Sequence, residues 1–167
     1  MSVLPIVQWP DPRLSTVCAP VDAPTCETLL NDMFDTMYAA KGRGLAGPQV
    51  GVLERLFVMD AGWKEGTPTP LVMINPEIEP CGEPASLEEM CLSVPDVGVP
   101  VLRPSSVFVR WHDEHGAPQA AQFGGAEARI IQHEFDHLDG KLFVDYISTL
   151  KRNRIKAKLE KLHKSRD

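Results

Sequence analysis

The segment 126–138 reads AEARIIQHEFDHL, and it decides how the rest of the chain is interpreted. Ile131, Phe135 and Leu138 recur at three- and four-residue spacing, which is typical of one apolar helix face. A glycine pair precedes the segment, and Gly140 stands where a helix commonly ends. We therefore predict a helix that opens after the glycine pair and runs to Leu138.

This predicted helix carries His133, Glu134 and His137 in the order H-E-x-x-H. Four residues turn a helix by about 400°, so the two imidazoles lie on one face, close enough to bind a single metal ion. Glu134 follows the first histidine, where its carboxylate reaches a metal-bound water without binding the metal. The spacing indicates a hydrolytic metal site. On this string alone, an ordinary amphipathic helix with two histidines and an acid remains an alternative.

A catalytic metal site needs a third protein ligand, and Cys91 is the candidate. It lies in the segment 88–95, EEMCLSVP, which we expect to be a strand or a loop edge. Cys18, Cys26 and Cys81 are interpreted as inert thiols. The four cysteines have no regular disulfide spacing, so we expect them to be reduced.

A third block, residues 42–51, reads GRGLAGPQVG. By itself it is compatible with a helix end followed by a turn, and it lacks the Gly-Lys-Ser/Thr of a phosphate-binding loop. Its significance comes from its order relative to the other two motifs.

The three blocks in order, G-x-G-L-A-x-P-Q-x-G, E-x-C-L-S and Q-H-E-x-D-H-L-x-G, resemble the peptide deformylase family. The resemblance extends from the region of residues 5–6 through the tail at 142–159, which is nearly the whole chain. It implies an α+β fold with a single domain, in which short antiparallel strands surround a central metal-binding helix and a helix closes the C-terminus.

The resemblance also implies an activity and a metal site. Cys91, His133 and His137 would be the metal ligands, and Glu134 would be the general acid/base. The implied ion is Fe²⁺, with Zn²⁺, Ni²⁺ or Co²⁺ as replacements; a thiolate and two imidazoles suit these ions better than Mg²⁺ or Ca²⁺. The implied reaction removes the formyl group from the N-terminal formylmethionine of newly synthesised polypeptides and releases formate.

Further site residues follow from the same resemblance. The Gln49 side-chain amide and the Leu92 backbone N–H would stabilise the oxyanion. Gly44 and Ile130 match positions that line the substrate cleft. Arg103 is aligned more loosely with an arginine near the peptide-binding groove.

Four residues depart from the pattern of the family: Arg43, Gly47, Met90 and Arg129. The family tends to have apolar residues at positions 43 and 129, alanine at position 47 and glycine at position 90. A side chain at Met90 would narrow the cleft, and two arginines at its rim would favour acidic or carboxylate-bearing substrates. The alternative is that the arginines are only solvated and Met90 packs inward.

Elements outside the motifs were predicted from periodicity and turn residues. Fifteen prolines and twelve glycines favour short strands and irregular loops. The predicted helices are 25–40, with Thr25 as N-cap, and one that begins near Ser148. The predicted strands are 55–60, 70–75, 106–111 and 120–123. We find no repeat or second domain.

The charge is divided unequally along the chain. Residues 148–167 hold eight basic and two acidic residues, whereas residues 1–147 hold nine basic and twenty-one acidic ones, within a total of −6. We therefore predict a catalytic part, 1–147, and a basic C-terminal helix of the same domain, 148–167, with Leu150, Ile155, Leu159 and Leu162 as its apolar stripe. Such a helix is either merely docked and solvated or a contact to the ribosome.

Two other functions compete with a deformylase. A zinc peptidase fits H-E-x-x-H alone, but the third ligand precedes the helix instead of following it. A diverged hydrolase with altered substrate, or a ribosome-associated binding protein on this fold, is the second alternative. No apolar stretch approaches the roughly 20 residues of a membrane span, so we expect no membrane contact and a cytoplasmic protein.

Overall fold

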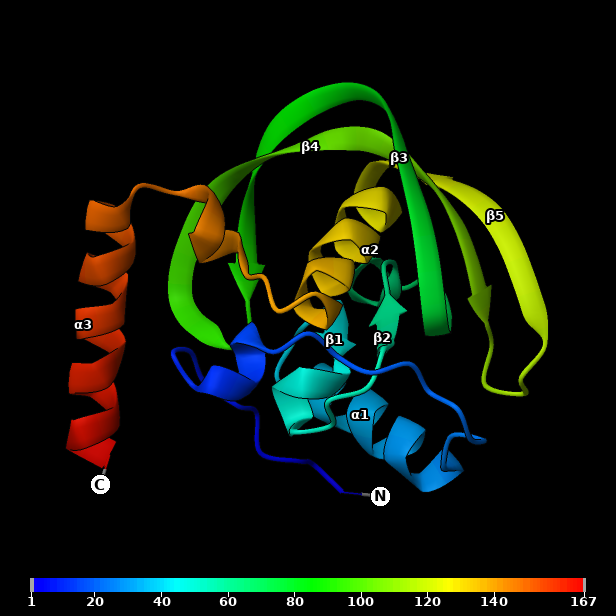
Figure 1. Ribbon diagram of the computed structural model, residues 1–167, viewed down its shortest axis with the longest axis horizontal. Coiled ribbons are helices and arrows are strands. Elements are labelled where there is room, and N and C mark those ends of the chain that lie inside the picture. The colour runs from blue at the N-terminus through cyan, green and yellow to red at the C-terminus, as the bar shows by residue number, and fades with distance from the viewer. Residues whose placement is uncertain (1, 167) are drawn as a thin grey trace.

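The computed structural model describes residues 2–166, and the side chains up to Lys164. A single antiparallel sheet has its strands in sequence order, with three α-helices around it, which confirms the α+β fold (Figure 1). The strands are β1 (Gly44–Ala46), β2 (Leu56–Asp60), β3 (Pro70–Cys91), β4 (Val94–His112) and β5 (Pro118–Gly124). The helices are α1 (Glu27–Ala39), α2 (Gly125–Leu138) and α3 (Thr149–Arg166), with 3-10 helices η1 (Pro12–Ser15), η2 (Gly47–Val50), η3 (Trp63–Glu65) and η4 (Phe143–Tyr146).

Strand β2 is buried on both faces and joins two parts of the core. Leu56 and Val58 point to one side, where they pack with α1. Phe57 and Met59 point to the other side, where they pack with α2. Side chains alternate along a strand, so an unbroken apolar run such as LFVM serves both layers at once. This packing fixes α1 and α2 on opposite sides of β2.

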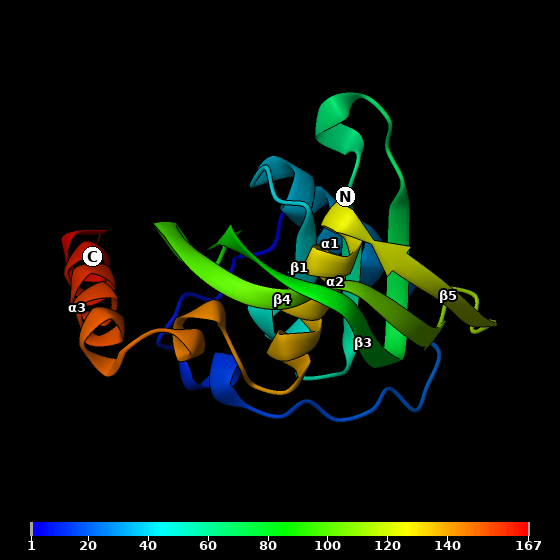
Figure 2. The same ribbon diagram turned by 90° about the horizontal axis from the view of Figure 1, so that it is seen from above.

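Helix α2 lies beneath the arch of β3 and β4, as both views show (Figures 1 and 2). Its apolar residues Ala128, Ile131 and Leu138 pack against the sheet. At its C-terminal end the Arg55 guanidinium donates a hydrogen bond of 2.9 Å to the Leu138 carbonyl, which satisfies one of the unpaired carbonyls of the last turn. Gly140 follows with a φ of 74°, as a helix stop requires.

The hairpin of β3 and β4 is much longer than the short strands that the sequence predicted. Residues 76–105 belong to it almost entirely, although they contain Pro76, Pro80, Pro84, Pro95, Pro100 and Pro104. Strand β2 pairs with β3 only along 70–74, and β5 pairs with β4 only along 106–112. Between these regions each strand has a free edge, where proline can be accommodated without losing a ladder hydrogen bond. Three register shifts interrupt the pairing.

The helix boundaries differ slightly from the predictions. Helix α1 begins at Glu27 with Cys26 as N-cap, not with Thr25. Helix α3 begins at Thr149, and Leu159 is buried beside the tip of the β3–β4 hairpin. Leu150 does not join this apolar stripe, because it is 62% exposed. All four cysteines lie in the described part of the chain and are unpaired. Among the described residues, no helix has the length and apolarity that crossing a membrane requires.

Candidate metal centre and catalytic cleft

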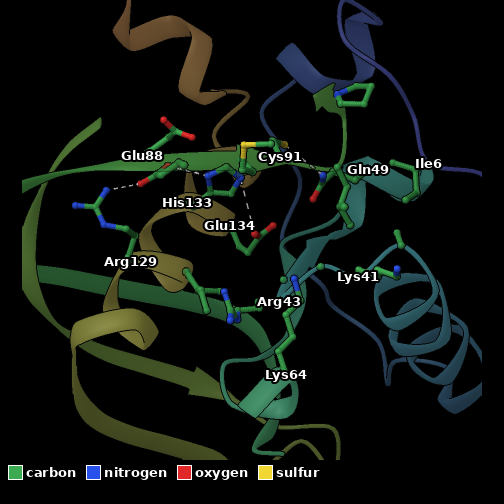
Figure 3. A pocket seen from close by; sticks show the side chains of 18 of the residues that line it. Ile6, Lys41, Arg43, Gln49, Lys64, Glu88, Cys91, Arg129, His133 and Glu134 are labelled. Carbon is green, nitrogen blue, oxygen red and sulfur yellow. Dashed lines mark hydrogen bonds and ion pairs between the residues drawn. The ribbon is translucent and has the colours of Figure 1, made fainter. Parts of the chain in front are cut away.

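Three predicted metal ligands meet beneath the tip of the β3–β4 hairpin. His133 and His137 lie one turn apart on α2. Cys91 ends β3 at the two-residue turn, and Figure 3 shows it beside His133. The Cys91 sulfur lies 3.5 Å from Nε2 of His137. One ligating atom from each of the three residues lies within 4.8 Å of the others, and all three residues are buried. The structure therefore brings together the ligand set that the sequence predicted.

Glu134 lies next to this group. Its Oε2 atom is 3.9 Å from Nε2 of His133, and its Oε1 atom is buried without a hydrogen-bond partner among the described residues. Burial raises the pKa of Glu134 to about 7. A Cβ atom at Gly44 would come within 2.6 Å of Oε2, so only glycine leaves room for the carboxylate. The side chain is therefore held at the cleft in a state suited to accept a proton.

Glu89 is the first residue of the E-x-C-L-S motif, but no role was assigned to it from the sequence. Its carboxylate lies 2.9 Å from Nδ1 of His133 and accepts hydrogen bonds from Arg103 and Arg129. Burial alone would raise the pKa of Glu89, but the hydrogen bonds from Arg103 and His133 lower it to about 2. Glu89 and Cys91 stand two residues apart, so they share one face of β3. That alternation is the signal that would have found Glu89.

The Gln49 side chain is fixed on three sides. Its oxygen accepts the Ala46 N–H at 2.9 Å, while its amide nitrogen donates to the Ser93 hydroxyl at 3.1 Å and lies 3.7 Å from the Cys91 sulfur. Gln49 is almost fully buried. Leu92 follows Cys91 in the hairpin turn. Ser93, the last residue of the E-x-C-L-S motif, thus orients the Gln49 amide toward the metal ligands.

A cleft with a volume of about 690 Å³ opens beside these residues. Gly44 and Ile130 line it, as expected, together with Gln49 and Leu92. Arg103, which the resemblance placed near the peptide-binding groove, is not among the residues that line this cleft, although its partner Glu89 is. Only 5% of Arg103 is exposed. Its guanidinium forms ion pairs with Glu89 and with Asp136, whose Oδ2 atom lies 2.9 Å from Nη1 of Arg103. Because both carboxylates pair with its guanidinium, Arg103 holds Glu89 in place.

Met90 and Arg129 resolve the alternatives that the sequence left open. Met90 does not pack inward: it is 59% exposed and lines the cleft. Arg129 is not a free rim charge, because it donates to the Ala85 carbonyl at 2.7 Å, the Val101 carbonyl at 3.0 Å and Glu89 at 2.7 Å. It joins α2 to both strands of the hairpin. Both residues line the cleft: Met90 shapes it with an exposed side chain, whereas Arg129 supports Glu89 through its hydrogen bond.

Arg43 and Gly47 occupy different environments. Arg43 lines the cleft and forms an exposed ion pair of 2.6 Å with Glu65. Gly47 is buried at the start of η2, where a Cβ atom would come within 2.6 Å of the Val52 carbonyl oxygen. Backbone atoms cannot yield as a flexible side chain does, so this local chain path requires glycine at position 47.

The donors fit a soft divalent metal ion. Burial lowers the pKa of His137 well below its ordinary value, so its ring is neutral, as a metal ligand must be. Burial opposes a charge on His133, but Glu134, Cys91 and Glu89 raise the pKa of this ring overall. These three groups therefore stabilise a positive charge at the position of the His133 ring. The hydrogen bond between His133 and Glu89 leaves Nε2 of His133 facing the group, an arrangement common behind metal-bound histidines.

Comparison with known proteins identifies the family. The sequence model described as polypeptide deformylase matches residues 3–153. This chain belongs to the peptide deformylase family. Peptide deformylase 2 of Xanthomonas campestris is 49% identical over 169 residues, covering 98% of each chain. The peptide deformylase of Pseudomonas aeruginosa is 48% identical over 167 residues, again with 98% of each chain covered.

Solved deformylase structures share the fold. A crystal structure of a Legionella pneumophila peptide deformylase has a TM-score of 0.90 and 41% identity, covering 99% of this chain and 98% of the other. The peptide deformylase of Ehrlichia chaffeensis in complex with actinonin has a TM-score of 0.91 and 40% identity, with coverage of 96% and 98%. The candidate metal centre of this deformylase-family chain thus lies in a fold that these deformylases share.

Proposed function

We propose that this protein removes the N-terminal formyl group from formylmethionine of newly synthesised polypeptides and releases formate. The observation that carries the proposal is the buried group of Cys91, His133 and His137, with the Glu134 carboxylate beside it, in the cleft of a deformylase-family chain. The reaction is hydrolysis of an amide, so water attacks the formyl carbon, and the bond to the peptide nitrogen breaks.

Cys91, His133 and His137 would hold a divalent metal ion, and we propose Fe²⁺, with Zn²⁺, Ni²⁺ and Co²⁺ as possible replacements. Such an ion activates water and polarises a carbonyl oxygen when it is bound. Glu134 would accept the proton of the attacking water and pass it to the leaving amine. Its raised pKa of about 7 suits both steps, since the carboxylate and the acid forms are then close in free energy.

Gln49 and Leu92 are proposed to stabilise the negative charge that develops on the formyl oxygen. Support comes from the buried Gln49 amide, which the Ser93 hydroxyl holds toward the Cys91 sulfur, and from the position of Leu92 at the cleft. Donors that are already oriented need not reorganise during the reaction, so each contributes about 2.7–4 kcal/mol to the transition state.

Gly44 and Ile130 are proposed to contact the substrate from the cleft wall, with Met90 narrowing the opposite side. Arg103 is proposed to act through Glu89 rather than on the substrate, because its guanidinium is buried and paired. It is therefore a positioning residue for His133.

The decisive experiment measures formate released from formyl-Met-Ala-Ser by purified, Fe²⁺-loaded protein under anaerobic conditions, with bound metal quantified in the same sample. Anaerobic handling protects both Fe²⁺ and the thiolate of Cys91. Wild type should release formate, and Glu134→Ala should lose at least 100-fold of kcat/KM while retaining its metal. Equal activity of the two proteins would refute the mechanism. Cleavage of internal peptide bonds without formate would instead support a peptidase.

A second proposal concerns helix α3 as a contact to the ribosome. Lys151, Lys156, Lys158 and Lys161 are exposed along it, whereas Arg152 is engaged with Asp145 and the Trp9 ring. An exposed row of lysines is complementary to the phosphates of ribosomal RNA. Removing the helix would uncover the buried Leu159, so charge reversal of the four lysines is the better test.

The reversed variant should co-sediment less with ribosomes in low salt, while its activity on formyl-Met-Ala-Ser stays unchanged. Wild-type co-sedimentation should itself fall as salt rises. Unaltered co-sedimentation of the variant would argue that α3 is only docked and solvated.

We further propose that residues 1–147 form the catalytic part and 148–167 a basic helix of the same domain. Leu159 supports this division, since it packs with Trp9 and Leu142 of the main body. The proposed substrate emerges from ribosomes, which favours the cytoplasm as the place of action.

A further inference from the structure

The catalytic cleft has walls of opposite charge. Lys41 and Arg43, which follow α1, line it together with Lys64 of η3. Glu88 and Asp96 line it from the two strands of the β3–β4 hairpin, where the charge of Arg129 is paired with that of Glu89. Figure 3 shows Lys41, Arg43 and Lys64 on the side of Glu134 away from Cys91, and Glu88 on the other side. We call the three cationic residues the basic wall.

Contacts of Trp63 hold the basic wall together, although its members are far apart in the sequence. The indole N–H of Trp63 donates to the Gly42 carbonyl at 2.9 Å, and its ring lies edge-on to Tyr38 at 5.2 Å. The Asp60 N–H donates to the Arg43 carbonyl at 2.9 Å. These contacts join η3 and β2 to residues 42–43, so the backbone positions that carry the cationic side chains are held side by side.

The basic wall is available for binding. Lys41 and Lys64 are exposed, and neither forms an ion pair with a described residue. The Lys64 ammonium lies 5.7 Å from the centre of the Trp63 ring, a contact that leaves its charge uncompensated. Arg43 is partly neutralised by Glu65 through an exposed pair. Two full positive charges therefore face whatever enters the cleft from this side.

We propose that the basic wall makes the protein favour formylated peptides that carry aspartate or glutamate shortly after the terminal methionine over peptides that carry lysine or arginine there. The proposal rests on the proposed deformylase function and defines its substrate class. Successive side chains of an extended peptide point to opposite sides, so one set of alternate positions would face the basic wall and the other the acidic side. Each exposed charge pair changes affinity by about twofold to fivefold.

The test compares tetrapeptides that begin with formyl-Met and carry a single Asp, Lys or Ser at the second, third or fourth position. Formate release is measured as kcat/KM at low salt. At one position at least, Asp should exceed Lys by about fivefold or more, since two lysines contribute. The double variant Lys41→Glu/Lys64→Glu should invert this ratio, and added salt should reduce it. Lys156→Glu on α3 makes a charge change of the same kind away from the cleft and should leave the ratio unaltered.

The outcomes separate this inference from the proposed function. Absence of formate from the all-Ser peptide would contradict the deformylase activity itself. Formate release with no position that prefers Asp, or with a preference that the double variant retains, would overturn the basic wall alone. Urea unfolding and metal content of the double variant equal to those of wild type establish that it is folded, so that a change in its Asp-to-Lys ratio is electrostatic.

Discussion

The Oε1 atom of Glu89 lies 2.9 Å from Nδ1 of His133, so a strand residue fixes the ring of a helix residue. The same carboxylate accepts hydrogen bonds from Arg103 and Arg129. One buried group thus links β3, β4 and α2 at the point where the metal ligands converge. Stability and metal binding are consequently expected to depend on the same side chain.

Replacing Glu89 with glutamine should weaken both properties. The variant leaves the half-buried Arg129 without its carboxylate and the buried Arg103 with Asp136 alone, which costs about 3–5 kcal/mol of unfolding free energy. It also loses the charged acceptor behind His133, so metal affinity should fall by about 10–100-fold. Urea unfolding and chelator competition measure the two effects. Glu88→Gln, an exposed neighbour, is the matched control and should change neither; similar behaviour of the two variants would contradict the role of Glu89.

Arg129→Leu should destabilise the protein by about 1–3 kcal/mol, because it removes hydrogen bonds to Glu89 and to two hairpin carbonyls. Arg110→Leu is a suitable comparison, since the exposed Arg110 forms a 3.6 Å pair with Glu79 and lies 5.0 Å from the centre of the Phe108 ring, but makes no contact with the metal ligands. That variant should lose less than about 1 kcal/mol. Urea unfolding of both proteins distinguishes the predictions, and equal losses would mean that Arg129 does not clamp the hairpin.

Gly44→Ala should reduce activity while leaving the fold intact. The added methyl group would meet the Glu134 carboxylate at 2.6 Å and displace it, and the side chain can move without disturbing the backbone. A displacement of about 1 Å commonly costs up to about 100-fold, so kcat/KM should fall by about 10–100-fold with bound metal unchanged. Gly124→Ala serves as control, because its nearest neighbour would be 3.8 Å away. Full activity of Gly44→Ala would show that Glu134 needs no such precise position.

Glu134 should make the metal-free protein less stable as the pH rises. Burial raises the pKa of this carboxyl from 4.5 to about 7, so between these values the native state holds a proton that the unfolded state has released. The unfolding free energy therefore falls across this window, by up to about 3 kcal/mol. The raised pKa of His133 acts in the same direction above pH 6.5, since its contribution is lost as the ring deprotonates.

Glu134→Gln should consequently give a flatter pH dependence. Urea unfolding at intervals from pH 5 to pH 8, in the presence of a chelator, measures the difference. The variant should gain stability relative to wild type at pH 8 but not at pH 5. Parallel curves for the two proteins would mean that Glu134 ionises normally in the native state.

The sequence predicted the elements that depend on local periodicity. Helix α2 and its ligands could be derived because the apolar spacing and H-E-x-x-H are both properties of one continuous segment. The hairpin could not be derived, since prolines such as Pro80 and Pro100 read as strand breakers. A proline interrupts a strand only where its nitrogen faces a paired edge of that strand. Which edges are paired is decided by segments distant in the sequence.

The candidate site divides in the same way. The sequence by itself determined the donor types Cys91, His133 and His137, the acid Glu134, and the division of charge between body and tail. Only the tertiary structure decided that Glu89 supports His133, that Arg103 is buried and paired with Glu89, and that Lys64 joins Lys41 on one wall. Donor chemistry belongs to individual residues, whereas burial, ion pairing and shared walls arise only when strands and helices far apart in the chain pack together.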